Sequence, residues 1–243
     1  MRDYLLDLVQ HTVPLGAFKS IRIDGTDTET EIAATEGDRQ LVLRGRLHKP
    51  SDDLVGTFGI PNISLLNTLL NISEYKDVDA KFSVLRETRE GTVQPVSISF
   101  ENKDGDFKNE FRLTASNIIN SLEPKSRFKI NTWAAEFSPS VVSQQRLKYQ
   151  TQANPTETAV TFKVRGGDII AHVGDIASHS GSFKFHTGVD ASISKAITVP
   201  LDYVNAVLSL NGDKVIRIGD FGMMISVDSG LANYDYILPT FVK

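Results

Sequence analysis

The chain has 243 residues, of which 40% are apolar and 23% are charged, a composition typical of a folded globular protein rather than a disordered one. Its 26 basic and 30 acidic side chains give a net charge of −4, which argues against a protein that grips nucleic acid through bulk positive charge. The chain has no cysteine, which excludes disulfides, thiolate zinc sites and cysteine nucleophiles. No apolar run comes near the roughly 18 residues of a transmembrane helix, and the N-terminus lacks a signal-peptide pattern, so we expect a cytoplasmic protein without a membrane partner.

Most of the chain alternates apolar and polar residues with a period of two, which predicts half-buried strands. The strand-like runs of the first half are 20–23, 40–44, 81–85, 96–100 and 110–114. Those of the second half are 160–164, 169–173, 182–186, 215–218, 223–227 and 233–238. Turn-forming pairs such as Asp24-Gly25 and Glu90-Gly91 separate the runs. The pattern therefore predicts antiparallel sheets with short connections.

Four stretches have helical rather than strand-like spacing: 4–13, 62–72, 138–149 and 201–210. Pro61 and Pro200 directly precede the second and the fourth. We expect the third to begin at Ser138-Pro139, because serine is a good N-cap and proline suits the first helical position.

The four helices form two pairs at one sequence offset. Asn67 and Asn205 are 138 positions apart (205 − 67), and the apolar residues around them coincide at that offset. The same offset places 140–149 on 2–11, the first helix. Chance alignment of short apolar helices is the alternative, but two pairs sharing one offset favour an internal repeat. The second copy begins with a strand-like run at 128–137, so we expect the first copy to lack its opening strand.

The segment between the two copies is polar, contains Pro124 and lacks periodicity, as is typical of a linker. It also carries Ile118, Ile119 and Leu122, which we expect to pack on the surface beneath it. We therefore predict two domains, 1–116 and 128–243, joined by a linker at 117–127.

One cluster suggests a metal or acid–base site: His172, Asp175, His179 and His186. These residues fall in a strand-like run and a loop, where the ligand spacing of a helix does not operate, so we interpret them as loop histidines. The segment 102–106 has some calcium-loop residues but lacks the closing glutamate, so we expect a hairpin turn. We expect no catalysis, no metal and no cofactor; a metal enzyme built on the histidine loop is a rival hypothesis.

In its order of elements the chain resembles the DNA polymerase sliding clamps of T4-like bacteriophages and, more remotely, proliferating cell nuclear antigen (PCNA). The matching features are the helix-first start, the Pro-led helix 61–72, the linker, the strand series 160–173 and the ending 232–239. The resemblance implies an α+β clamp fold of two repeated domains, with antiparallel sheets outside and two helices on the inner face of each. It also implies a homotrimeric ring around duplex DNA in the host cytoplasm, with a DNA polymerase and a clamp loader as partners. A β-rich viral structural or attachment protein is the alternative.

By this resemblance, five bases would face the hole of the ring and contact phosphates: Arg2, Lys76, Arg146, Lys148 and Lys214. The stretch 137–156 contains no acid, which agrees with this assignment. Asp3 and Asp7 lie on the first helix and would repel phosphate, which weakens the case for Arg2. Each base could instead belong to an ordinary solvated helix face.

The resemblance also implies two protein contacts. Between subunits, strand 110–114 would pair with strand 182–186, anchored by Phe111, Leu113, Phe183 and Phe185, unless these side chains fill their own domain cores. Partner peptides would bind an apolar groove formed by Leu47, Ile118, Ile119, Leu122, Tyr236, Leu238, Pro239 and Phe241. The C-terminal segment could instead close the last sheet, although we expect Pro239 to interrupt strand pairing and leave Phe241 beyond it.

Overall fold

The computed structural model describes residues 1–89, 91–123, 133–175, 179–189 and 195–241. The chain divides into two compact units. Unit 1 comprises Met1–Gly37, Leu43–Arg127 and Ser229–Tyr234, and unit 2 comprises Asp38–Val42, Phe128–Asp228 and Asp235–Lys243. Two short segments thus belong to the unit opposite the one that the predicted domain bounds give them.

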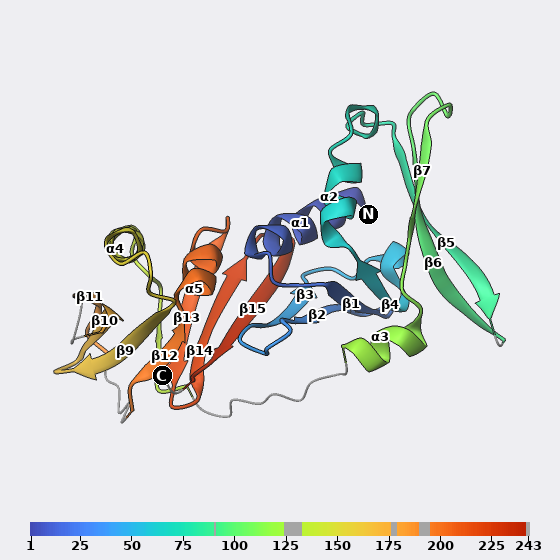
Figure 1. Cartoon of the computed structure of the whole chain (residues 1–243). Helices are drawn as coiled ribbons and strands as arrows, with labels where there is room; N and C mark the ends of the chain where they lie inside the picture. The colour runs from blue at the N-terminus through green and yellow to red at the C-terminus, as the bar shows by residue number, and fades with distance from the viewer. Residues whose placement is uncertain (90, 124–132, 176–178, 190–194, 242–243) are drawn as a thin grey trace. The chain divides into compact units, whose positions relative to one another are not determined.

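Unit 1 begins with helix α1, and its first strands follow the order β4-β1-β2-β3, in which β1 pairs antiparallel with both β2 and β4. The elements up to the second helix are α1 (Arg2–Thr12), η1 (Val13–Leu15), β1 (Ser20–Gly25), β2 (Thr30–Thr35), β3 (Val42–Leu47), η2 (Asp52–Leu54), β4 (Gly56–Pro61) and α2 (Ile63–Leu70). Helices α1 and α2 pack against each other (Figure 1). Each buries an apolar face, which includes Leu5 and Leu8 on α1 and Leu66 and Leu70 on α2.

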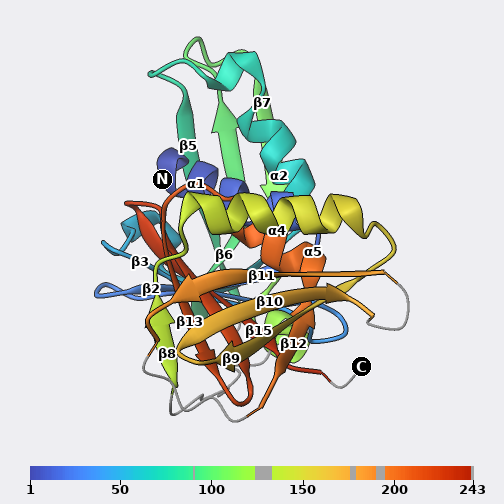
Figure 2. The same cartoon turned by 90° about the vertical axis from the view of Figure 1, so that its left-hand side faces the viewer.

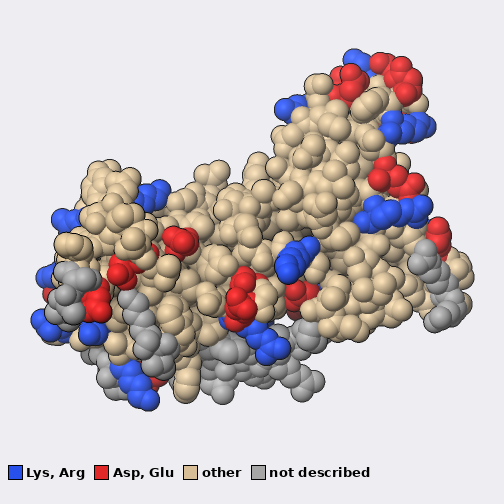
Figure 3. Space-filling model, in the orientation of Figure 1, with Lys and Arg blue, Asp and Glu red and all other residues tan. Residues whose placement is uncertain are grey.

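A second, three-stranded sheet in the order β5-β6-β7 completes unit 1 together with helix α3. Its elements are η3 (Ser73–Tyr75), β5 (Lys81–Arg89), β6 (Thr92–Glu101), β7 (Lys108–Arg112) and α3 (Ser116–Leu122). At the end of this sheet where β5 and β7 begin and β6 ends, Lys81 and Lys108 both pair with Glu101. Figure 3 shows acidic and basic side chains close together on the surface.

Unit 2 holds the antiparallel sheet β11-β10-β9-β12 and the strand order β15-β14-β13-β8, although residues 232–234 of β15 belong to unit 1. Its elements are β8 (Ala135–Phe137), α4 (Val141–Ala153), β9 (Ala159–Arg165), β10 (Asp168–Gly174), β11 (Ser180–Thr187), β12 (Ile197–Pro200), α5 (Leu201–Leu208), β13 (Asp213–Gly219), β14 (Gly222–Asp228) and β15 (Ala232–Pro239). Helix α4 lies alongside β11 and also contacts α5 (Figure 2). Among the described residues, no helix is long and apolar enough to cross a membrane.

The repeat found in the sequence is visible in the element bounds. Shifting α2 (63–70) by 138 gives 201–208, the bounds of α5, and shifting α1 (2–12) gives 140–150, within one residue of the start of α4. Every predicted strand overlaps an observed one, while β2, β4 and β12 were not predicted. Of the run 128–137 predicted as a strand, 128–132 lie outside the described residues and β8 covers 135–137.

Two local predictions were wrong. Helix α4 begins after Ser140 rather than at Ser138-Pro139, because the Ser140 hydroxyl accepts the Ser143 N–H at 3.1 Å and so caps the first turn. The predicted linker contains helix α3, whose Ile119 is fully buried as expected, whereas Ile118 and Leu122 are exposed rather than packed on the surface beneath. A Cβ atom at Gly59 would lie 2.8 Å from Ile119 Cδ1 and 2.9 Å from Thr114 Cβ, so the lack of a side chain at this position of β4 lets α3 approach closely.

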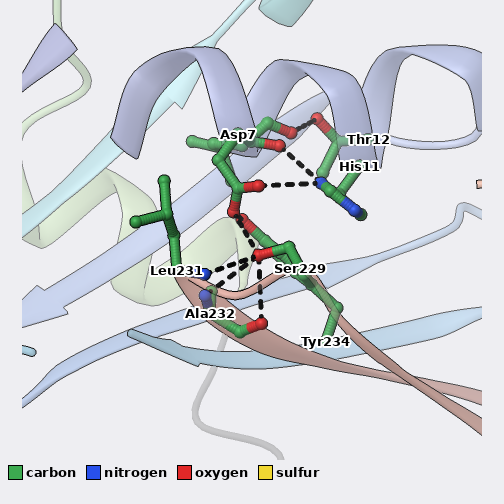
Figure 4. A network of polar contacts seen from close by, with 8 residues as sticks. Asp7, His11, Thr12, Ser229, Leu231, Ala232 and Tyr234 are labelled. Carbon is green, nitrogen blue, oxygen red and sulfur yellow. Dashed lines mark hydrogen bonds and ion pairs between the residues drawn. The ribbon is translucent and has the colours of Figure 1, made fainter. Parts of the chain in front are cut away.

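A buried carboxylate joins α1 to the segment Ser229–Tyr234 within unit 1 (Figure 4). The carboxylate of Asp7 accepts hydrogen bonds from the hydroxyls of Ser229 (2.9 Å) and Tyr234 (2.8 Å), and His11 Nδ1 lies 3.3 Å from its other oxygen. The rings of His11 and Tyr234 stack with centroids 4.7 Å apart. Burial raises the pKa of Asp7, but the hydrogen bonds from His11, Tyr234 and Ser229 and the charge of His11 outweigh burial, so the pKa is lowered.

Because the pKa of Asp7 is lower in the folded chain, its ionised form stabilises the fold above the unfolded pKa, and this contribution is lost as the pH falls through the folded pKa. We expect Asp7→Asn to lower the free energy of unfolding by about 2 kcal/mol at neutral pH, because it removes the negative charge to which the two hydroxyls and His11 bind. Urea unfolding at neutral pH and at about pH 3, near or below the usual aspartate pKa, measures the difference.

Asp3→Asn is the matched control, because Asp3 is exposed on the same helix. It should change the free energy of unfolding by less than about 0.5 kcal/mol. An Asp7→Asn loss equal to that of the control, or one that persists unchanged at low pH, would contradict this role.

Candidate nucleic-acid interface

Helix α4 is the most polar helix of unit 2 and carries its charge in one sign. Of its thirteen residues only Ser143 and Leu147 are buried. Arg146 and Lys148 are exposed, and the helix contains no acidic residue, so it contributes two positive charges to a chain of net charge −4. A net negative charge does not exclude a local positive surface, and α4 provides one.

The two cations of α4 lie on different flanks of the helix. Successive residues turn by about 100°, so Arg146 and Lys148 are roughly 160° apart around the axis. The ridge between them includes Gln145 and Tyr149, whose side chains are joined by a 2.7 Å hydrogen bond. Within the described part of the chain neither cation makes a hydrogen bond or an ion pair. Both are therefore available to phosphates on either side of the ridge.

Helix α5 supports α4 through a polar contact. The Asn205 side-chain amide donates to Thr151 Oγ1 at 2.7 Å. Asn205 is thus the α5 residue that fixes α4, while its counterpart Asn67 on α2 receives the Asn71 amide at 3.0 Å. On α2, Asn62 serves as the N-cap and accepts the Leu65 N–H. These asparagine side chains therefore make contacts within or between the helices of their own unit.

The other three bases predicted to face DNA have different surroundings. Lys76 is exposed just after η3. The Arg2 guanidinium lies 5.8 Å from the centroid of the Phe82 ring. Lys214 donates to the carbonyls of Leu210 (2.5 Å) and Gly212 (3.0 Å), and burial lowers its pKa although Asp213 acts to raise it. Arg2 and Lys214 thus already have partners within their own units.

The edge strands predicted for the subunit contact do lie at sheet edges, since β7 ends the order β5-β6-β7 and β11 ends the order β11-β10-β9-β12. Two of the four predicted anchors, however, are core residues, because Phe111 is 3% and Phe185 is 1% exposed. Leu113 and Phe183 are half-buried. For Phe111 and Phe185 the alternative interpretation, packing within their own units, is the correct one.

The residues predicted for the peptide groove divide in the same way. Ile118 and Leu122 are exposed on α3, and Pro239 and Phe241 are half-buried. The remaining four are buried: Leu47, Ile119, Tyr236 and Leu238. For Tyr236 and Leu238 the structure therefore supports the alternative, in which they close the last sheet as part of β15.

Strand β15 ends at Pro239, as expected, but the expectation that Phe241 has no strand to join was wrong. Thr240 N–H donates to the Phe221 carbonyl (3.0 Å) and Phe241 N–H donates to the Thr198 carbonyl (3.1 Å), because both residues after the proline retain their donors.

The sequence analysis missed Phe221, which is 70% exposed in the turn between β13 and β14 and beside this C-terminal segment. A phenylalanine in an Asp-Phe-Gly turn, where polar residues are usual, was the available signal.

The histidines of the predicted cluster have different surroundings. His186 stacks on Phe137, with ring centroids 4.2 Å apart, and His172 is half-buried on β10. Within the described ranges no group of three or more His, Cys, Asp or Glu side chains is arranged to hold a metal ion.

Comparison with known proteins identifies the fold. The sequence matches no protein-family model and no curated protein sequence. The structure is similar to A. fulgidus PCNA bound to the C-terminal region of FEN-1, with a TM-score of 0.69 and 12% identity over 100% of this chain and 96% of that one. It is also similar to PCNA from Thermococcus kodakaraensis, with a TM-score of 0.66 and 10% identity over 99% and 97% of the two chains. The chain therefore has the PCNA clamp fold along its whole length, which confirms the predicted α+β class.

Proposed function

We propose that this protein is a sliding clamp that encircles duplex DNA as a homotrimer and tethers a replicative DNA polymerase, as in the T4-like bacteriophages that the sequence resembles. The observation that carries the proposal is a clamp fold over the whole chain whose helix α4 presents two cations and no acid. In this function the protein binds and positions its partners and catalyses no reaction itself.

The charge distribution suits such a role. A closed ring holds DNA by topology, so it needs weak contacts with phosphates that let the duplex slide, rather than a strongly basic body. A net charge of −4 with Arg146 and Lys148 on one helix meets that requirement. Lys76 is the further exposed base that we assign to the hole, whereas Arg2 and Lys214 already hold partners.

We propose that the ring closes by main-chain pairing between β7 of one copy and β11 of the next. An edge strand presents unpaired N–H and C=O groups, and a second copy satisfies both edges at once. The half-buried Leu113 and Phe183 would supply the apolar contact, in place of the buried Phe111 and Phe185.

We propose that partner peptides bind through exposed apolar residues near the linker and the C-terminal segment. In unit 1 these are Ile118 and Leu122 on α3. The buried Ile119 of the same helix packs against Gly59 of β4 and holds α3 in place. In unit 2 the exposed residue is the newly found Phe221, together with the half-buried Pro239 and Phe241. An exposed aromatic side chain is a common anchor for a short peptide.

The DNA contact is tested with the double variant Arg146→Ala/Lys148→Ala. Loss of two phosphate contacts should weaken duplex binding and reduce the magnitude of the slope of log K against log salt by about 2. Fluorescence anisotropy with a labelled duplex across a salt series measures both. Lys163→Ala/Arg165→Ala is the control, because it removes the same charge from exposed positions on β9. Equal effects from the two double variants would refute the assignment to α4.

The subunit contact is tested by mass in solution. Three copies of 26.8 kDa give about 80 kDa (3 × 26.8) for the intact protein. Phe183→Glu and Leu113→Glu should each yield a folded monomer, because a charge is placed on the edge that must be covered. Val93→Glu, at an exposed apolar position of β6, should leave the trimer intact. A trimeric Phe183→Glu variant would exclude the pairing.

The peptide surface is tested with a C-terminal peptide of the cognate polymerase. We expect Phe221→Ala to weaken its binding by about tenfold or more, as for a central aromatic anchor. Phe107→Ala removes a similarly large aromatic residue that is 40% exposed on unit 1 and should have no effect. Isothermal titration calorimetry compares the variants, and unchanged affinity in Phe221→Ala would remove this turn from the binding surface.

A further inference from the structure

Helix α4 touches strand β11 at two places. Ser143 Oγ donates to the Phe185 carbonyl at 2.5 Å, and the Gln150 side chain lies against Gly181, where an added Cβ would meet the amide. The two helix residues are seven positions apart (150 − 143), or roughly 10 Å, and the two strand residues are four apart (185 − 181), or roughly 13 Å. The helix therefore lies along the strand and runs in the opposite direction (Figure 2).

The Phe185 carbonyl can accept this bond because β11 is irregular there. The pairing of β11 with β10 passes from His186 to Lys184 between Ile169 and Ile170, which skips Phe185. A bulged residue is left out of the ladder and its carbonyl can point elsewhere. The Phe185 ring is buried beside Phe162, with centroids 5.3 Å apart, so the bulged residue is anchored in the core of unit 2.

The hydrogens of this contact can be assigned by counting donors. A serine hydroxyl has one hydrogen, and Ser143 must give its hydrogen to the Phe185 carbonyl, which can only accept. The 2.8 Å contact between the Ser140 and Ser143 hydroxyls is therefore donated by Ser140. Ser140 in turn accepts the Ser143 N–H. The helix cap and the strand bulge thus belong to one chain of hydrogen bonds.

We infer that Ser143 is a positioning residue, which holds the first turn of α4 to the bulge in β11 and thereby sets the direction of Arg146 and Lys148. Arg146 follows Ser143 by three residues, on the next turn of the helix. The inference rests on the proposed function, in which β11 receives the neighbouring copy and α4 faces the phosphates. Ser143 would then tie the subunit contact to the DNA contact.

The first test needs no DNA and uses the full-length protein. Ser143→Ala removes the hydroxyl and leaves the buried Phe185 carbonyl without its donor, whereas Ser143→Thr retains a hydroxyl. We expect backbone hydrogen exchange in 144–149 to become about fivefold faster in Ser143→Ala, to return toward the original rate in Ser143→Thr, and to stay unchanged in α5. Unchanged exchange in Ser143→Ala, or equal acceleration in α4 and α5, would overturn the inference.

The second test asks whether Ser143 acts through the cations. Ser143→Ala should weaken duplex binding about fivefold in the original protein and not at all in Arg146→Ala/Lys148→Ala. An equal loss in both backgrounds, or no loss in the original protein, overturns the inference while the proposed DNA contact stands. If Arg146→Ala/Lys148→Ala itself leaves duplex binding unchanged, the proposed DNA contact of α4 fails and the positioning role fails with it.

Discussion

The position of α4 depends on polar contacts, because the helix has almost no apolar face. A surface helix is usually held by a stripe of buried apolar residues, as α1 and α2 are. Among the described residues Leu147 is the one buried apolar side chain of α4, and the polar contacts that hold the helix include the Ser140 cap, the Ser143 bond to Phe185 and the Asn205 bond to Thr151. A helix held in this way keeps most of its circumference for solvent or a ligand. Such a helix depends on hydrogen-bond partners that point in the right direction. The bulge at Phe185 provides one of them, because it frees the Phe185 carbonyl from the strand ladder.

Some charged residues of the helices make contacts inside the fold and are not available to a ligand. Asp7, which by sequence would have made α1 repellent to phosphate, is buried in a network with His11, Ser229 and Tyr234. Lys214 is likewise used inside its own unit, where it binds carbonyls at the end of α5. The charges left exposed on the helices are therefore fewer than the sequence suggests. Those on α4 are all positive, which makes a contact with phosphates possible in an acidic chain.

Periodicity predicted the elements well, because it reflects burial directly. The shared offset of α2 and α5 could be found since both helices carry the same apolar spacing between a proline and a turn. The alternation of apolar and polar residues could not predict how deeply Phe111 and Phe185 are buried. The same pattern arises whether an apolar strand face packs in the core of its own unit or is covered by another subunit. Helix α3 has only seven residues, too few for a clear periodic signal. It is stabilised by the contact of Ile119 with Gly59 and by Arg22, which binds Asn120 at 2.6 Å. Tertiary contacts of this kind have no local sequence pattern.

The claim that the protein encloses DNA is tested most directly by asking whether DNA ends control its release. Protein is mixed with a linear duplex, both ends are then blocked with bulky groups, and the complex is washed in high salt, which removes proteins held by phosphate contacts alone. A clamp should remain on the blocked duplex through the wash and leave when a restriction enzyme cuts the DNA between the blocks. Loss of the protein in the wash whether or not the ends are blocked, or retention after the cut, would contradict a topological ring.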